Sequence, residues 1–167
     1  MKLNQMFNIK QGHQITDEEL YILEGKIPVL TGRNELKGYW GKSLVSNKDL
    51  PCITYPTKGN NDGDVYIQYN LFDANNTAVI IPLPEWRDKI SLEWVVFKLR
   101  HLFREVQTSK EGVSYLNREL VNELNIDVPD MNTQLKELKN YKILQIIKKR
   151  LESALEETNS LLDKTIK

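Results

Sequence analysis

Cysteine, histidine and long apolar runs are scarce in this 167-residue chain. Its single cysteine, Cys52, excludes an internal disulfide and any zinc site built from several cysteines. Two histidines, His13 and His101, leave little for metal binding or for a catalytic triad. The longest apolar runs have about four or five residues, such as Ala78–Ile81, whereas a membrane-spanning helix needs roughly 20. The sequence therefore predicts a chain without a metal site and without a membrane span.

An excess of charge of either sign is also missing, because 23 basic and 23 acidic residues cancel. A neutral chain gives no sign of a nucleic-acid partner and counts mildly against strong non-specific binding to DNA. The N-terminus has no apolar signal core and no small-residue cleavage site, so we expect a cytoplasmic protein. The apolar fraction of 40% is typical of a globular chain, and the length suits one ordinary domain.

Several signatures of enzymes are absent as well. The chain contains no Walker phosphate loop, no GxSxG nucleophile elbow and no Asn/Asp-Pro-Pro-aromatic methyltransferase motif. Half of a nuclease motif, Glu-x-Lys, occurs at Glu35–Lys37 and at Glu137–Lys139, and we interpret both as solvated surface charge. Neither His13 nor His101 has a carboxylate at a set spacing, and we expect Cys52 to be a small buried hydrophobe. We therefore predict that the chain is not an enzyme; a small enzyme with an unrecognised site is a minor alternative.

The distribution of glycine and proline along the chain changes near Asp130. All eight glycines and all six prolines lie in residues 1–129, where short apolar segments alternate with turn residues. This pattern predicts a mixed α/β domain, and with the helix below an α+β fold. The expected strands are Lys26–Thr31, Pro51–Tyr55, Val65–Tyr69, Ala78–Pro82 and Ile126–Val128, and the expected helices are Ser91–Val106 and Leu116–Leu124.

The segment Met131–Lys167 contains neither glycine nor proline and is rich in Leu, Lys, Glu and Gln. It predicts one helix of about 35 residues, roughly 50 Å long, capped by Asp130, Asn132 or Thr133. Part of so long a helix must project from its domain or pack on another molecule.

Apolar residues recur along one side of this predicted helix, and such a stripe favours pairing with a partner helix. The alternative is a helix that lies across its own domain. Thr158 and Gln145 interrupt the stripe, so a long ideal coiled coil is not expected. The stripe comprises Leu144, Ile147, Leu151, Leu155, Leu162 and Ile166, and a similar earlier one comprises Met131, Leu135, Leu138 and Tyr141.

Four loops combine basic, amide and aromatic residues with glycine: residues 10–14, 31–42, 57–61 and 108–115. Arg, Asn and Gln can read base edges, whereas Lys, Ser and Thr suit phosphates. Glycine allows a ligand to approach the backbone closely. The alternative is that these loops are only solvated turns.

The order of these segments resembles one half of a specificity (S) subunit of type I restriction–modification enzymes, over nearly the whole chain. FNIKQGHQIT is similar to that family's start, GKIPVLTGRNELKGYWGK to its Gly-x-Ile-Pro-Val strand and loop, and ITYPTKGNNDGDVYI and TAVIIPLP to its next strands. SKEGVSYLNRELVNELNIDVPDMNTQ is the most specific piece, ending on a Gln that opens the helix. The family's doubled proline before that Gln is replaced here by Pro129-Asp130-Met131-Asn132, and a second recognition domain is missing.

The resemblance implies a target recognition domain at residues 1–129 and, at residues 130–167, a long helix for dimerisation and subunit docking. In this family the subunit is not catalytic. It reads half of a bipartite site on double-stranded DNA and directs a methyltransferase (modification) subunit, and with it a restriction subunit, to that site. S-adenosylmethionine and ATP are then expected only in the partner subunits, and this chain should bind no cofactor.

From loop position and donor chemistry we expect eight residues near the DNA: Arg33, Asn34, Lys37, Tyr39, Lys58, Asn60, Lys110 and Ser114. Because the chain has one recognition domain and one helix, we expect two copies to pair through Leu144, Ile147, Leu151, Leu155 and Leu162. The alternative from another class is an adaptor that binds no DNA and docks a partner through its long helix.

Overall fold

The computed structural model describes residues 1–22, 25–59, 64–106, 108–110 and 113–165, and its architecture is α+β, as predicted. An antiparallel sheet of four strands has the order β1-β7-β4-β5. Its register places Ile80 of the central strand β7 between Ile9 and Ile53 of its neighbours. The strands are β1 (Phe7–Gln11), β7 (Thr77–Pro82), β4 (Cys52–Pro56) and β5 (Tyr66–Gln68).

Both faces of the two central strands, β4 and β7, are buried. Because side chains alternate along a strand, Ile53 and Tyr55 enter a larger core on one face, while Cys52 enters a smaller core on the other. Helix α2 (Leu92–Val106) covers the first face with an apolar side that includes Trp94 and Leu99. Burial on both faces explains why these strands read as continuous apolar runs.

A second, three-stranded sheet has the order β3-β2-β6. Strand β2 (Ile27–Leu30) pairs antiparallel with β3 (Leu36–Trp40) and parallel with the two-residue strand β6 (Asp73–Ala74). Strands β8 (Thr108–Lys110) and β9 (Val113–Tyr115) form a separate pair. The remaining short elements are α1 (Asp17–Ile22), α3 (Arg118–Glu123) and the 3-10 helices η1 (Leu3–Gln5), η2 (Asn47–Asp49) and η3 (Pro84–Trp86).

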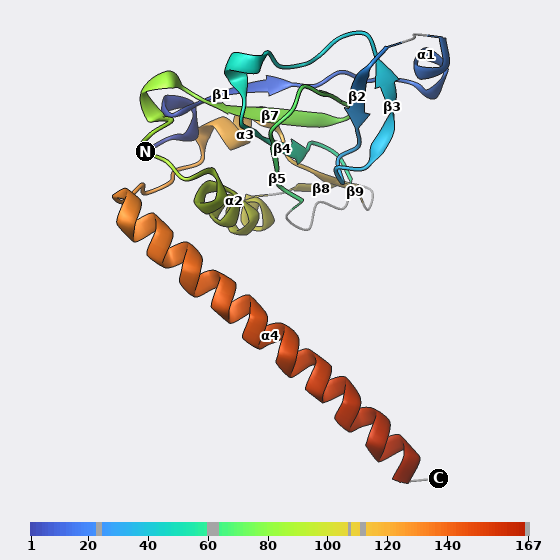
Figure 1. Ribbon diagram of the computed structural model, residues 1–167, viewed down its shortest axis with the longest axis vertical. Coiled ribbons are helices and arrows are strands. Elements are labelled where there is room, and N and C mark those ends of the chain that lie inside the picture. Colours follow the sequence, from blue (N-terminus) through green and yellow to red (C-terminus); the bar gives the residue numbers. More distant parts are fainter. Residues whose placement is uncertain (23–24, 60–63, 107, 111–112, 166–167) are drawn as a thin grey trace.

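The long helix α4 (Met131–Thr165) begins beside the N-terminus of the chain and projects far beyond the domain (Figure 1). Asp130 caps it, because its carboxylate accepts hydrogen bonds from the Thr133 backbone N–H at 3.1 Å and hydroxyl at 2.7 Å. The same two bonds lower the pKa of Asp130. Only the first turns of α4 pack on α2, where the Tyr141 ring lies 4.3 Å from that of Phe97. The alternative of a helix that lies across its own domain therefore holds only for the first turns of α4, and pairing of the remainder with a partner helix stays a prediction.

A polar side chain, Gln134, joins α4 to the domain. It is fully buried, and its amide oxygen accepts a hydrogen bond from the Ser91 N–H at 2.9 Å. Its amide nitrogen donates to the carbonyl oxygens of Lys89 and Pro129, both at 2.8 Å. The earlier apolar stripe is only partly correct, since Leu135 is exposed and Gln134 takes the buried place.

Two sequence-based predictions are wrong. Ile126–Val128 forms no strand, because its pairing with the N-terminal segment is too short. Asn125 makes an isolated bridge to Lys2, and the Ile126 N–H donates to the Met1 carbonyl. Glu137 is more than solvated charge, because its carboxylate accepts a hydrogen bond from the Trp94 indole and pairs with Lys98, both at 2.8 Å. These contacts, the one to Lys98 foremost, lower the pKa of Glu137.

Candidate nucleic-acid interface

Three segments that are distant in sequence lie on the side of the domain away from the start of α4, and a fourth, Tyr115–Arg118, leads from them back to α3 (Figure 1). The Thr57 N–H donates to the Asn76 carbonyl at 2.9 Å, the Leu116 N–H donates to the Thr57 carbonyl at 3.2 Å, and Lys58 forms a bridge with Tyr115. Gly32 lies so close to Pro56 that a Cβ atom would be 2.6 Å from the proline Cβ. We call this surface the loop end; it comprises Gln11–His13, Thr31–Glu35, Thr57–Gly59 and Tyr115–Arg118.

Two recesses indent the loop end. A small one, of about 210 Å³, separates the β2–β3 turn from the segment after β4, and Arg33 and Lys58 both line it. A larger one, of about 820 Å³, carries Arg118 on its wall. The first is lined by Thr31, Gly32, Arg33, Glu35, Pro56, Lys58, Gly59 and Asp64; the second by Gln11, Thr57, Thr108, Tyr115, Leu116, Asn117, Arg118 and Glu119.

The turn between β2 and β3 fixes the backbone that carries Arg33 and Asn34. The Asn34 N–H donates to the Thr31 carbonyl at 2.9 Å, and the Thr31 N–H donates to the Glu35 carbonyl at 2.8 Å. Asn34 has a φ of 62°, a left-handed conformation that asparagine tolerates. Its side-chain oxygen accepts a hydrogen bond from Gln68 at 2.6 Å.

The eight predicted DNA contacts are only partly brought together. Arg33, Asn34 and Lys58 share the loop end. Lys37 lies further along β3. Its ammonium donates to the Ile15 carbonyl at 2.8 Å and pairs with Asp17, the first residue of α1, at 2.9 Å, so its contacts are made within the domain. Tyr39 is exposed two residues beyond Lys37. Asn60 lies outside the described residues; Lys110 and Ser114 belong to β8 and β9, but their side chains are outside the described part.

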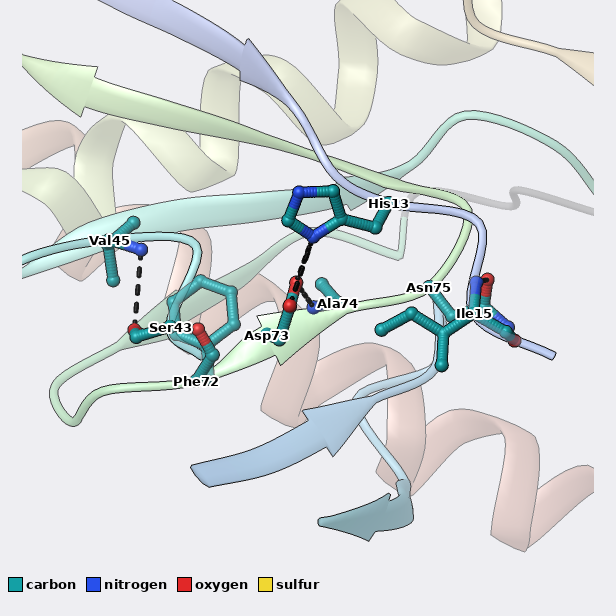
Figure 2. Close-up of polar contacts among 8 residues, drawn as sticks. All are labelled: His13, Ile15, Ser43, Val45, Phe72, Asp73, Ala74 and Asn75. Carbon is teal, nitrogen blue, oxygen red and sulfur yellow. Dashed lines mark hydrogen bonds and ion pairs between the residues drawn. The ribbon is translucent and has the colours of Figure 1, made fainter. Parts of the chain in front are cut away.

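His13 was predicted only as part of the loop 10–14 and not as one of the eight DNA contacts, although its side chain has a buried partner. Its Nδ1 atom is 3.0 Å and 3.1 Å from the two carboxylate oxygens of Asp73, as Figure 2 shows. These residues are 60 positions apart, and no spacing rule links them. Arg118 was also missed, because only the fold brings α3 beside Thr57. The one available signal was the Gly12-His13 loop itself.

A second candidate surface is the apolar stripe of α4, which we call the seam: Leu144, Ile147, Leu151, Leu155 and Leu162. These residues are between 46% and 65% exposed, so the described part of the chain leaves them largely uncovered. With Thr158 included, the spacings of 3, 4, 4, 3 and 4 repeat every 11 residues, and that period keeps a stripe on one side of a nearly straight helix. The seam lies about a quarter of a turn around the helix from the side that contacts the domain.

The positions of the single cysteine and of the possible metal ligands bear on the chemistry open to the chain. Cys52 is fully buried, as predicted, and burial raises the pKa of its thiol to about 12. Within the described ranges, no group of three His, Cys, Asp or Glu side chains could hold a metal ion. In the same ranges no helix is long and apolar enough to cross a membrane.

Comparison of the sequence with known protein families and with curated proteins gives no match. Comparison of the structure with solved structures does. The S subunit of the type I restriction-modification system from M. genitalium matches with a TM-score of 0.59 and 17% identity, over 98% of this chain and 43% of that chain. The HsdS subunit from Thermoanaerobacter tengcongensis matches with a TM-score of 0.66 and 13% identity, over 92% of this chain and 38% of that one.

A further match is a chain from a study of complex assembly and conformational transition of the type I R-M system, with a TM-score of 0.72 and 14% identity. It covers 98% of this chain and 42% of that chain. The present chain thus spans about two fifths of the length of each of these structures. The resemblance read from the sequence is confirmed for the fold: this chain has the fold of a type I specificity subunit, over less than half of that subunit's length.

Proposed function

We propose that this chain is a non-catalytic, sequence-specific DNA-recognition subunit of a restriction–modification enzyme, which reads one half-site and directs a methyltransferase subunit to it. The observation that carries this proposal is the likeness of nearly the whole chain to solved type I specificity subunits. The loop end supports it independently, because it groups Arg33, Asn34 and Lys58, whose side chains suit base edges and phosphates.

In this proposal the loop end faces the DNA. Arg33 and the NH₂ group of Asn34 reach base edges, and Lys58 neutralises a phosphate. Lys37, Tyr39, Asn60, Lys110 and Ser114 remain predicted contacts. The carboxylates of Glu35 and Asp64 line the same recess as Arg33 and Lys58, so non-specific attraction to DNA is weak there. Partner subunits then provide much of the backbone binding.

Helix α4 has two tasks in this proposal. Its seam pairs antiparallel with the seam of a second copy, which buries both stripes and relates the two recognition domains by a twofold axis. Its remaining exposed sides bind the methyltransferase subunit and, where one is present, a restriction subunit. The recognised DNA is then an interrupted palindrome. S-adenosylmethionine and ATP are bound by the partner subunits and not by this chain.

Salt-dependent binding to DNA tests the proposal. The chain is co-expressed with a type I methyltransferase subunit, chosen from the neighbouring genes where one is encoded there, and the purified complex is titrated with labelled duplex at increasing salt. We expect the logarithm of the binding constant to fall linearly with the logarithm of salt concentration. A complex that co-elutes but binds no duplex at any salt would support the adaptor instead. A chain that never co-elutes with the methyltransferase would contradict its role in that enzyme.

A further inference from the structure

His13 and Asp73 form an oriented pair at the loop end. The Asp73 side chain is fully buried, whereas that of His13 is 53% exposed. The carboxylate accepts hydrogen bonds from the His13 ring and, through Oδ1, from the Ala74 N–H at 2.7 Å. In Figure 2 the Nδ1 atom faces Asp73 and the other ring nitrogen, Nε2, points away from it. A buried carboxylate needs hydrogen-bond donors, and the His13 ring and the Ala74 N–H are two that the structure gives Asp73.

The backbone that carries His13 is equally constrained. The Gly12 N–H donates to the Thr77 carbonyl at 2.7 Å, and a Cβ on Gly12 would lie 2.5 Å from that oxygen. The Asn75 side chain accepts a hydrogen bond from the Ile15 N–H at 3.1 Å and donates to the Ile15 carbonyl at 3.0 Å. The imidazole also lies nearly parallel to the Trp40 ring, 16° apart in plane, with the centroids separated by 6.2 Å. The hydrogen bonds of the loop and the contacts of the ring together favour one orientation of the imidazole.

The pairing decides which nitrogen of the neutral imidazole carries the proton. A carboxylate can only accept hydrogen bonds, so Nδ1 must be the donor. Nε2 then presents a lone pair toward the surface, since the His13 side chain is 53% exposed. Asn76 connects His13 to the rest of the loop end. Its N–H donates to the His13 carbonyl, and its own carbonyl accepts a hydrogen bond from the Thr57 N–H.

We propose that His13 reads one base of the half-site, and that Asp73 is its positioning residue. The exposed Nε2 accepts a hydrogen bond from an exocyclic amino group, which in the major groove belongs to adenine or cytosine. Guanine and thymine offer only acceptors along the same edge, so the fixed acceptor discriminates against both. This inference rests on the proposed function, since it supposes that the loop end faces DNA.

The sharpest test is Asp73→Asn, which keeps the shape of the side chain but reverses the hydrogen bond. The amide oxygen would stay with the Ala74 N–H, and the amide NH₂ would then take the place of Oδ2, 3.0 Å from Nδ1. Nδ1 would become the acceptor, so the proton would move to Nε2. Nitrogen-15 NMR of the labelled chain should show a Nδ1-protonated His13 in the native protein and a Nε2-protonated one in the variant. His101, whose Nε2 faces Glu105 at 3.7 Å, is an internal control.

The base preference is measured by selecting from a randomised duplex library with the methyltransferase complex. The native chain should enrich adenine or cytosine at one position of each half-site, and the selected base decides between the two. His13→Ala should lower that enrichment by about two- to tenfold, the contribution of one hydrogen bond. Asp73→Asn should shift the preference at the same position toward guanine or thymine. Circular dichroism checks that both variants fold.

The outcomes separate the two proposals. If the native complex selects a motif and both variants select the same motif unchanged, the role of His13 is refuted while the proposed function stands. A Nε2-protonated His13 in the native chain would refute it as well. If the native complex selects no motif, the proposed function fails, and the role of His13 fails with it.

Discussion

The buried amide of Gln134 should be among the most sensitive positions in the chain. Gln134→Leu keeps a similar size but removes all three of its hydrogen bonds, which leaves the Ser91 N–H and the carbonyls of Lys89 and Pro129 without their side-chain partner. These three groups are only part-buried, so each costs about 1–2 kcal/mol when it loses its partner, the lower part of the range for a buried group. Burying the leucine returns about 1.5–3 kcal/mol. The free energy of unfolding should therefore fall by about 1–4 kcal/mol, out of the ~5–15 kcal/mol typical of a domain.

The matched control is Gln145→Leu, the same substitution at an exposed position of the same helix. It should change the free energy of unfolding by at most ~0.5 kcal/mol. Urea unfolding followed by tryptophan fluorescence measures both variants, because Trp94 lies in the core next to this joint. Protein concentration is held equal, since any dimerisation adds to the apparent stability. Equal stability of the two variants would refute the role assigned to Gln134.

Three further predictions concern the seam, the loop end and the core. Leu151→Glu should convert a dimer to a monomer in light scattering, because it places a charge in a buried seam. Ser153→Glu, on the opposite side of α4, should leave the dimer intact. A dimer that survives Leu151→Glu would place the interface elsewhere. Arg33→Ala and Lys58→Ala should each weaken binding of the full assembly to its DNA target, and loss of a base-reading arginine costs about 1–3 kcal/mol. Lys48→Ala on η2 should leave the affinity unchanged. Unchanged affinity of both the Arg33 and the Lys58 variant would refute the placement of DNA at the loop end. Since the pKa of Cys52 is raised to about 12, iodoacetamide at pH 8 should label it far more slowly in the folded chain than in urea, and equal rates would contradict its burial.

Periodicity and composition predicted the strands that are buried on both faces and the long helix that lacks glycine and proline. Strands β4 and β7 are apolar throughout because both of their faces are covered, and α4 excludes glycine and proline along its whole length. Strand β1 was missed, since its sequence Phe-Asn-Ile-Lys-Gln has only two apolar residues and its pairing with β7 bridges about 70 positions. Strand β3, with Lys37 and Gly38 near its centre, gave no apolar alternation either.

Only those parts of the candidate site whose residues are neighbours in the sequence could be predicted. Arg33 and Asn34 could be selected because a turn rich in glycine and polar residues surrounds them, and the structure places them together with Lys58. The pair of His13 and Asp73 could not be found, because it depends on a parallel pairing between β2 and the two-residue strand β6 that no sequence pattern announces. Gln134 was noticed through the family resemblance, and its burial required the packed joint between α2 and α4.

The polar joint around Gln134 and the first three segments of the loop end lie on different sides of the domain, with the four-stranded sheet between them (Figure 1). None of the residues in that joint, Ser91, Lys89, Pro129 and Gln134, lines either recess. We therefore expect substitutions in the loops to leave the hydrogen bonds around Gln134 intact, so that binding preference and the attachment of α4 can be altered separately.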